Sequence, residues 1–306
     1  MFCLNFSSIS SRLNKNIQLD KKIEQSFFTT SKHSTKSPTI LFQTTVFGKT
    51  PRYRNECPFE CVYTSNRSFF NKADAVVFHA NDLRENKRLK VANNKQKFVF
   101  FSLEAPVALE RLSQGTWWKN VLKFHWIMSY AKNSHIQMNY KNGQLLGYFK
   151  DLGNKFNAIG DFTLKSVLKG KKKRGAIWFV SNCWSQERMQ VAEALKKHFH
   201  VDIGGQCGDN TLCSLGQNCS QLISQYYFYL AFENANCVDY VTEKLFNKLD
   251  LPIVPIVMKR SVYEKILPPE AFIAVDDFDS AKTLADFLTF LINNPRLYFE
   301  YFEVEK

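Results

Sequence analysis

The stretch FYLAFENANCVDYVTEKLF, residues 228–246, decides the fold that we predict for this chain. It opens with an apolar run typical of a buried strand, continues through a polar loop, and ends in a helix that we expect from about Val241. Because strand, loop and helix in this order form the repeating unit of α/β proteins, we predict a parallel sheet. Open α/β sheets bind ligands at the carboxyl ends of their strands, so the polar loop is a candidate site.

The first turn of the expected helix carries Thr242, Glu243 and Lys244. A helix N-terminus presents unpaired N–H groups and a partial positive charge, so a pyrophosphate can bind there while Lys244 adds a point charge. Glu243 is better suited to accept hydrogen bonds from sugar hydroxyls, and Asn234 and Tyr240 in the loop can contact a donor near its leaving group. A purely structural alternative, with Glu243 at a helix start and Lys244 in solvent, would be favoured if this segment stood alone.

A second cation follows another predicted strand. The apolar run 176–180 ends near Asn182, and Arg188 comes within the first turns of a helix that we expect over 186–199. An arginine there can bind phosphate through two parallel hydrogen bonds, and two cations with a helix dipole can stabilise a departing nucleoside diphosphate without a metal. Taken singly, Arg188 is more often a residue of a solvated helix surface.

The first half of the chain alternates apolar runs with amphipathic stretches in the same way, with runs at 39–48, 75–82 and 98–103. Glu104 follows the last run, so a carboxylate stands at the carboxyl end of a predicted strand. Partial burial would raise the pKa of Glu104 toward neutrality, which suits a general base that deprotonates an acceptor hydroxyl. An equally favoured alternative is a glutamate that only stabilises a helix start.

This alternation predicts two α/β domains with parallel sheets that face each other across a cleft. We expect a flexible stem at 1–37, an acceptor-side domain at 38–170 and a nucleotide-binding domain at 171–306. The basic cluster at 169–174 is interpreted as a solvated linker.

The composition leaves the partner open. Lys and Arg exceed Asp and Glu by 41 to 28, giving a net charge of +13, which fits a small anionic substrate or a nucleic acid. Because the basic residues are scattered, nucleic-acid binding is the less favoured interpretation. Asp277 and Asp279 have a metal-binding spacing, but Asp279 with Ser280 also fits a helix cap, so we predict no metal site.

The eight cysteines fit an enzyme that folds in an oxidising compartment. Cys57 with Cys61, and Cys207, Cys213 and Cys219 in a Gly-rich loop, could form local bridges, with free buried thiols as the alternative.

Three Asn-X-Ser tripeptides, beginning at Asn5, Asn66 and Asn218, give weak support to a secretory route. No window approaches the roughly 18 consecutive apolar residues of a membrane span. We therefore expect either a soluble protein or one whose anchor lies outside this sequence.

Several motifs resemble, in order and spacing, those of the alpha-1,3/4-fucosyltransferase family, glycosyltransferase family 10. The resemblance covers residues 40–300 and rests on ADAVVFHANDL at 73–83, FFSLEAP at 100–106, WIMSYAKNSHI at 126–136, AIWFVSNC at 176–183, VDIGGQCG at 201–208, FYLAFEN at 228–234, DYVTEK at 239–244 and LPPEAFIAVDDF at 267–278. The run NCVDYVTEK and the Cys-rich loop look most similar to invertebrate enzymes that fucosylate the N-glycan core.

The resemblance implies a two-domain GT-B fold and inverting transfer of fucose from GDP-fucose to a GlcNAc hydroxyl, with an alpha-1,3 linkage. The acceptor would be an N-glycan core or an N-acetyllactosamine-type (LacNAc-type) glycan, and Glu104 would be the general base. No cofactor would be required, although Mn2+ or Mg2+ could stimulate transfer. The residues that would hold GDP-fucose are Arg188, Asn234, Tyr240, Glu243 and Lys244.

The resemblance also implies attachment to the Golgi membrane, on its luminal side, through an anchor that is not present in this sequence. Family members usually continue beyond the position of Lys306 into a helical, cysteine-bearing segment. The alternative to an active enzyme is therefore a catalytically silent family member that binds a glycan or a nucleotide.

Overall fold

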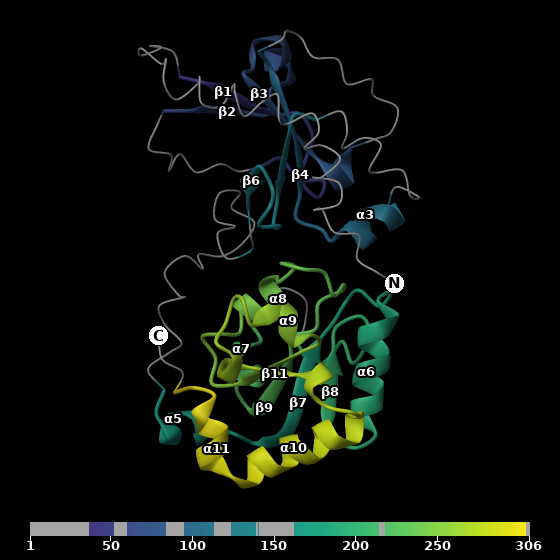
Figure 1. The fold of residues 1–306 in the computed structure, drawn as a ribbon, viewed down its shortest axis with the longest axis vertical. Helices are drawn as coiled ribbons and strands as arrows, with labels where there is room; N and C mark the ends of the chain where they lie inside the picture. The colour runs from purple at the N-terminus through teal and green to yellow at the C-terminus, as the bar shows by residue number, and fades with distance from the viewer. Residues whose placement is uncertain are drawn as a thin grey trace. The chain divides into compact units, whose positions relative to one another are not determined.

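The computed structural model describes residues 37–51, 60–83, 95–112, 124–138, 140, 162–213 and 218–303. The chain divides into two compact units, Met1–Lys150 and Asp151–Lys306, each with one parallel sheet (Figure 1). Of the predicted stem at 1–37, only the last residue is described. In the part of the chain that the structure describes, no helix is both long and apolar enough to cross a bilayer.

The first unit is built on a six-stranded sheet with the order β2-β1-β3-β4-β5-β6 and parallel pairing throughout. Its elements are β1 (Thr39–Phe42), β2 (Val62–Thr64), η1 (Arg67–Lys72), β3 (Ala75–His79), η2 (Ala80–Asp82), β4 (Lys97–Ser102), α3 (Pro106–Leu112), β5 (Trp126–Ser129) and β6 (Ile136–Gln137). Aromatic rings fill the core: the Phe78 ring lies 5.2 Å from that of Phe98 and 5.4 Å from that of Phe124, between centroids. Burial of β3 and β4 on both faces accounts for their nearly continuous apolar sequences.

The second unit contains a five-stranded parallel sheet with the order β11-β10-β9-β7-β8. Its strands are β7 (Lys173–Phe179), β8 (Val201–Gly204), β9 (Tyr226–Leu230), β10 (Val254–Val257) and β11 (Ile273–Ala274). Its helical segments are α5 (Leu164–Leu168), α6 (Gln186–Lys196), α7 (Ser220–Ile223), α8 (Glu243–Phe246), α9 (Arg260–Tyr263), η5 (Pro269–Ala271), η6 (Val275–Asp277), α10 (Ala281–Asn293) and α11 (Pro295–Glu300). The central strand β9 is buried at every position, and the long helix α10 packs against α6 and α11 (Figure 1).

The runs predicted as strands at 98–103, 176–180 and 228–233 overlap β4, β7 and β9, each of which begins one to three residues earlier than predicted. The helix expected over 186–199 is α6, which ends at Lys196. The helix expected from about Val241 begins at Glu243 and lasts one turn. The predicted α/β class with two parallel sheets is therefore confirmed.

The two units separate after Lys150, whereas the sequence pointed to a linker at 169–174. Helix α5 belongs to the second unit because Val167 is fully buried in that unit's core. Nearby, the Phe162 ring packs edge-on against Phe302, 5.4 Å away between centroids.

Within the basic cluster at 169–174, Lys171 differs from the solvated linker that we expected, whereas the other four charged residues are exposed. The Lys171 amine donates to the backbone carbonyls of Tyr226 and Pro252 and lies 5.6 Å from the ring centroid of Tyr227. Burial lowers the pKa of Lys171 to about 7. Lys171 thus anchors the start of β7.

Candidate active site

A buried carboxylate organises the loop that follows β9. Glu233 is 3% exposed, and its two oxygens accept hydrogen bonds from the backbone N–H and the hydroxyl of Thr242, at 2.7 and 2.8 Å. A buried charge is tolerated only when it is paired and hydrogen-bonded, so these contacts fix Thr242 relative to the end of the strand. Burial raises the pKa of Glu233, and the nearby charge of Lys244 opposes that shift.

Lys244 supplies the cation of this loop. Its Nζ lies 3.2 Å from Glu233 Oε2 and 3.1 Å from Glu243 Oε1, and it donates to Thr242 Oγ1 at 2.9 Å. Burial alone would lower the pKa of Lys244, but the two carboxylates outweigh it and raise the pKa above its usual value. Lys244 is therefore positively charged at neutral pH and held in place, with 24% of its side chain exposed.

The helix start itself contributes less than the sequence suggested. Helix α8 has only four residues, and the N–H of Lys244 already donates to the Thr242 hydroxyl at 3.4 Å. A helix this short has a weak dipole. Lys244 is the cation of this loop, but its three amine hydrogens already face Glu233, Glu243 and Thr242, so its role in binding an anion stays a prediction.

Arg188 lies inside the protein, with 2% of its surface exposed. Its guanidinium donates to the carbonyl oxygens of Asn182, at 2.5 Å, and Phe232, at 3.0 Å, and so joins the loops after β7 and β9. It also stacks over the Trp178 ring at 5.6 Å. Burial lowers the pKa of Arg188, and the charge of Glu233 counteracts this.

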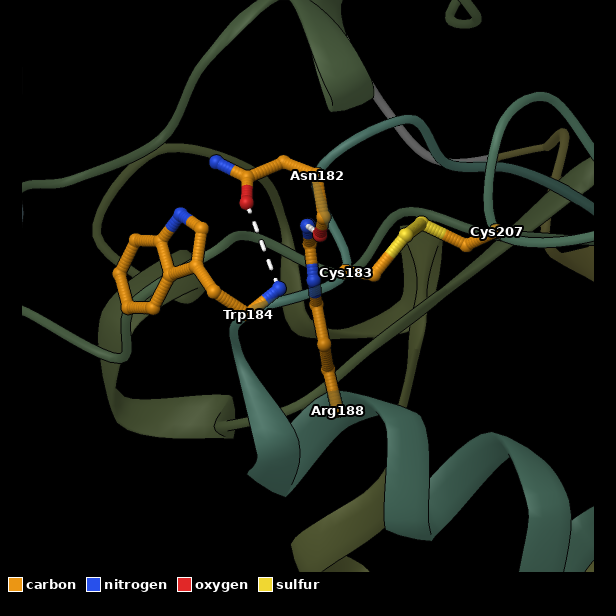
Figure 2. The surroundings of a disulfide bond; sticks show 5 residues. All are labelled: Asn182, Cys183, Trp184, Arg188 and Cys207. Atoms are coloured by element: carbon orange, nitrogen blue, oxygen red, sulfur yellow. Dashed lines mark hydrogen bonds between the residues drawn. A yellow bond between two sulfur atoms is a disulfide. The ribbon is translucent and has the colours of Figure 1, made fainter.

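The phosphate-binding role predicted for Arg188 needs an available donor. In the structure its terminal nitrogens hold backbone carbonyls, and its Nε is buried without a hydrogen-bond partner. Figure 2 shows the Arg188 side chain beside Asn182 and the disulfide. This geometry indicates a residue that holds two loops together, and its role in donor binding stays a prediction.

Asn234 and Tyr240 lie in the same loop as Glu233 but differ in burial. The Oδ1 atom of Asn234 is buried and has no hydrogen-bond partner, so it can accept a hydrogen bond from a ligand. Tyr240 is 1% exposed, so its ring is part of the core and does not offer an open face for stacking. It follows Asp239, which adopts a left-handed conformation (φ 63°) that aspartate tolerates better than most residues.

Two disulfides shape the carboxyl edge of this sheet. Cys183 pairs with Cys207, which ties the loop after β7 to the loop after β8 (Figure 2). Cys213 pairs with Cys219, which is one of the local bridges allowed by the sequence, and Cys237 is also disulfide-bonded. The predicted Cys57–Cys61 pairing involves a residue outside the described ranges.

Glu104 occupies the predicted position in the first unit. It follows β4 directly, is half-buried, and its N–H donates to the buried Ser102 hydroxyl at 3.1 Å. The preceding carbonyl of Leu103 accepts a hydrogen bond from the Tyr140 hydroxyl at 2.9 Å. The backbone around Glu104 is thus held from two sides before α3 begins.

Two buried groups with polar contacts were not foreseen from the sequence. Glu233 was not singled out, although a carboxylate directly after an apolar run is a usable signal. The second is His79, at the end of β3. Its Nδ1 lies 2.6 Å from Asp82, and its Nε2 is buried without a partner among the described residues. Asp82 also accepts hydrogen bonds from Thr45 and Gly48, so the pair holds the loop after β1. Burial lowers the pKa of His79 despite the Asp82 contact.

Of the two aspartates with metal-binding spacing, Asp277 has a structural role. Asp277 pairs with Arg260 at 2.5 Å, and Ser280 forms a capping box with Thr283 at the start of α10. Among the residues that the structure describes, no group of three His, Cys, Asp or Glu side chains is placed to hold a metal ion.

Comparisons with known proteins identify the family. The family model described as "Glycosyltransferase family 10 (fucosyltransferase) C-term" matches residues 169–306, and "Fucosyltransferase, N-terminal" matches 35–141. The chain belongs to glycosyltransferase family 10. This confirms the family that the sequence motifs predicted.

Family 10 relatives include alpha-(1,3)-fucosyltransferase fut-1 of Caenorhabditis elegans, 34% identical over 81% of this chain and 54% of its own length. Glycoprotein 3-alpha-L-fucosyltransferase A of Drosophila melanogaster is 35% identical over 81% of this chain and 48% of its own length. The chain thus spans about half the length of these curated relatives.

A crystal structure of an alpha1,3-fucosyltransferase with GDP matches the fold with a TM-score of 0.57 at 19% identity. The match covers 90% of this chain and 85% of that one. A structure titled as the alpha1,3-fucosyltransferase with GDP-fucose matches equally well. The two parallel sheets and this likeness confirm the predicted GT-B fold.

Proposed function

We propose that the chain is the catalytic part of an inverting alpha-1,3-fucosyltransferase that moves fucose from GDP-fucose to a GlcNAc hydroxyl of an N-glycan or related glycan. The observation that carries the proposal is the charged Lys244, fixed by Glu233 at the carboxyl edge of a parallel sheet. Family 10 membership and the GDP and GDP-fucose complexes of the fold's solved neighbours support the same donor.

Each donor-site residue has a chemical task in this proposal. Lys244 neutralises the diphosphate as negative charge builds on the leaving group. Glu243 has 38% of its side chain exposed and can accept hydrogen bonds from ribose or fucose hydroxyls. The unpartnered Oδ1 of Asn234 accepts one more donor hydrogen bond. Arg188 and Tyr240 are both buried, so in this proposal they hold the loop after β9 in position and do not contact the donor directly.

Glu104 is the proposed general base. Its carboxylate takes the proton of the acceptor hydroxyl as that oxygen attacks the anomeric carbon of fucose. The bond from that carbon to the diphosphate oxygen breaks, the electron pair leaves with GDP, and the configuration inverts.

The Cys183–Cys207 and Cys213–Cys219 bridges support folding in an oxidising compartment. They are consistent with a luminal Golgi location, which stays a proposal. Metal dependence is a separate question, and we expect transfer to continue in EDTA, with Mn2+ or Mg2+ as stimulants only.

Mass spectrometry of transfer from GDP-fucose to a panel of N-glycan-core and LacNAc-type acceptors tests the proposal. Lys244→Ala should raise the dissociation constant of GDP, with Lys196→Ala on the exposed face of α6 as the matched control. Glu104→Gln should reduce turnover while leaving GDP affinity unchanged, with the exposed Glu110→Gln on α3 as its control.

The outcomes separate the candidate functions. Addition of a deoxyhexose to one acceptor supports an active enzyme and identifies its substrate class. A folded protein that binds GDP without transferring fucose is instead a silent family member. If Lys244→Ala and Lys196→Ala bind GDP equally well, Lys244 has no part in donor binding.

A further inference from the structure

We propose that Asn66 carries an N-linked oligosaccharide. The tripeptide Asn66-Arg67-Ser68 is exposed at all three positions, between β2 and η1 of the first unit. This modification is independent of fucose transfer and rests only on entry into a secretory compartment, which the disulfides support.

The second tripeptide in the described residues is a poorer acceptor. In Asn218-Cys219-Ser220 only the asparagine is exposed. Cys219 is bonded to Cys213, and Ser220 begins α7. A glycan-transferring enzyme has to approach the backbone and the hydroxyl two residues on, so the bonded Cys219 and the helical Ser220 disfavour Asn218. The tripeptide at Asn5 lies outside the described residues.

The local geometry at Asn66 leaves its reactive atom accessible. The backbone is extended (φ −76°, ψ 108°), and Oδ1 accepts a hydrogen bond from the Ser68 N–H at 3.1 Å. Within the part of the chain that the structure describes, Nδ2 of Asn66 has no hydrogen-bond partner. The carbonyl side of the amide is therefore held by the Ser68 N–H, while the nitrogen keeps both of its hydrogens unengaged among the described residues.

The co-reactant is an oligosaccharide linked through pyrophosphate to a polyprenyl lipid. Nδ2 of Asn66 forms a bond to the anomeric carbon of the first sugar and loses one proton. The bond from that carbon to the pyrophosphate oxygen breaks, and the lipid pyrophosphate leaves with the electron pair. No redox change occurs.

The position of Asn66 gives the glycan a physical consequence. Among the residues that the structure describes, strand β2 lies at the edge of the sheet and pairs only with β1. It consists of the uncharged residues Val62, Tyr63 and Thr64. Val62 is 46% exposed, and Phe69, three residues beyond Asn66, is 38% exposed. Proteins protect such edges from pairing with other chains, usually with charge or proline. A bulky polar glycan beside β2 would do the same.

Peptide mass spectrometry after enzymatic glycan removal tests this proposal. The full chain is expressed behind a cleavable leader in a secretory host, and protein from cells and medium is pooled. Deglycosylation in heavy-oxygen water should convert Asn66 to labelled aspartate. Asn66→Gln and Ser68→Ala should lower the mass of the intact protein by one oligosaccharide, whereas Ser68→Thr and Asn218→Gln should leave that oligosaccharide in place.

Unlabelled Asn66 in molecules whose Cys183–Cys207 bridge has formed would overturn the proposal, because those molecules have entered an oxidising compartment. Labelling of Asn218 alone would overturn it too. Both results are read from peptides, so they hold whether or not the protein transfers fucose. Asn66→Gln should also aggregate faster than Asn218→Gln when both are folded.

Discussion

Removing the Cys183–Cys207 bridge by changing both residues to serine should destabilise the second unit strongly. The bridge joins residues 24 positions apart in sequence, with Cα atoms 5.6 Å apart. A cross-link that closes a loop of this length removes about 12 cal/mol/K of entropy from the unfolded chain, or about 3.4 kcal/mol at 25 °C. The Cys213–Cys219 bridge, with a separation of 6, is the matched control. The same relation gives about 2.2 kcal/mol for it.

Scanning calorimetry of the full chain can measure both losses. For a unit of this size, 1 kcal/mol shifts the melting temperature by about 2–4 °C, so we expect a fall of about 7–14 °C for the first pair and about 4–9 °C for the control. Hydrogen exchange of peptides from β7 and β8 would assign the transition to the second unit. An equal or greater loss for the Cys213/Cys219 double variant would refute the loop-closure reasoning.

Three further predictions concern the second unit. Glu233→Gln should lower the free energy of unfolding by about 3 kcal/mol because it breaks a buried ion pair. Glu243→Gln, on the exposed side of Lys244, should lower it by under about 1 kcal/mol, and equal losses for the two variants in urea unfolding would contradict this prediction. Burial lowers the pKa of Lys171 from 10.5 to about 7, so between these pH values the unfolded chain binds more protons and stability should rise with pH. Lys171→Met should remove that rise, and an unchanged slope between pH 7 and pH 9 would exclude Lys171 as its source. Leu288→Ala, at a fully buried position of α10, should cost about 2–5 kcal/mol in urea unfolding, and a loss below about 1 kcal/mol would place Leu288 outside the well-packed core.

The strands could be predicted because burial on both faces leaves a continuous apolar signature, as at 98–102 and 226–230. The contacts of Lys171 could not be predicted from the pattern of apolar residues. A charged residue in a basic cluster is assigned to solvent by default, and only the fold brings the carbonyls of Tyr226 and Pro252 to its amine. The same limit applies to α5, whose five residues are too few for a periodic pattern.

The candidate site was predictable in its residue types but not in its connections. Thr242, Glu243 and Lys244 stand together as the sequence places them. Their link to Glu233 depends on how the intervening loop turns back, which includes the left-handed Asp239. The burial of Arg188 could not be foreseen either, because helical spacing alone does not tell which carbonyls a side chain will meet.

A single oxygen atom limits how this loop can vary. The Thr242 hydroxyl donates its one hydrogen to Glu233 and accepts two hydrogen bonds from Lys244, one from Nζ and one from the backbone. A hydroxyl has one hydrogen and two lone pairs, so its bonding capacity is filled. Serine could replace threonine here. Valine has nearly the same shape but no hydroxyl, so it would remove one hydrogen bond from the Glu233 carboxylate and one from the Lys244 ammonium. Over evolutionary time this position should therefore tolerate exchange only among hydroxyl-bearing side chains.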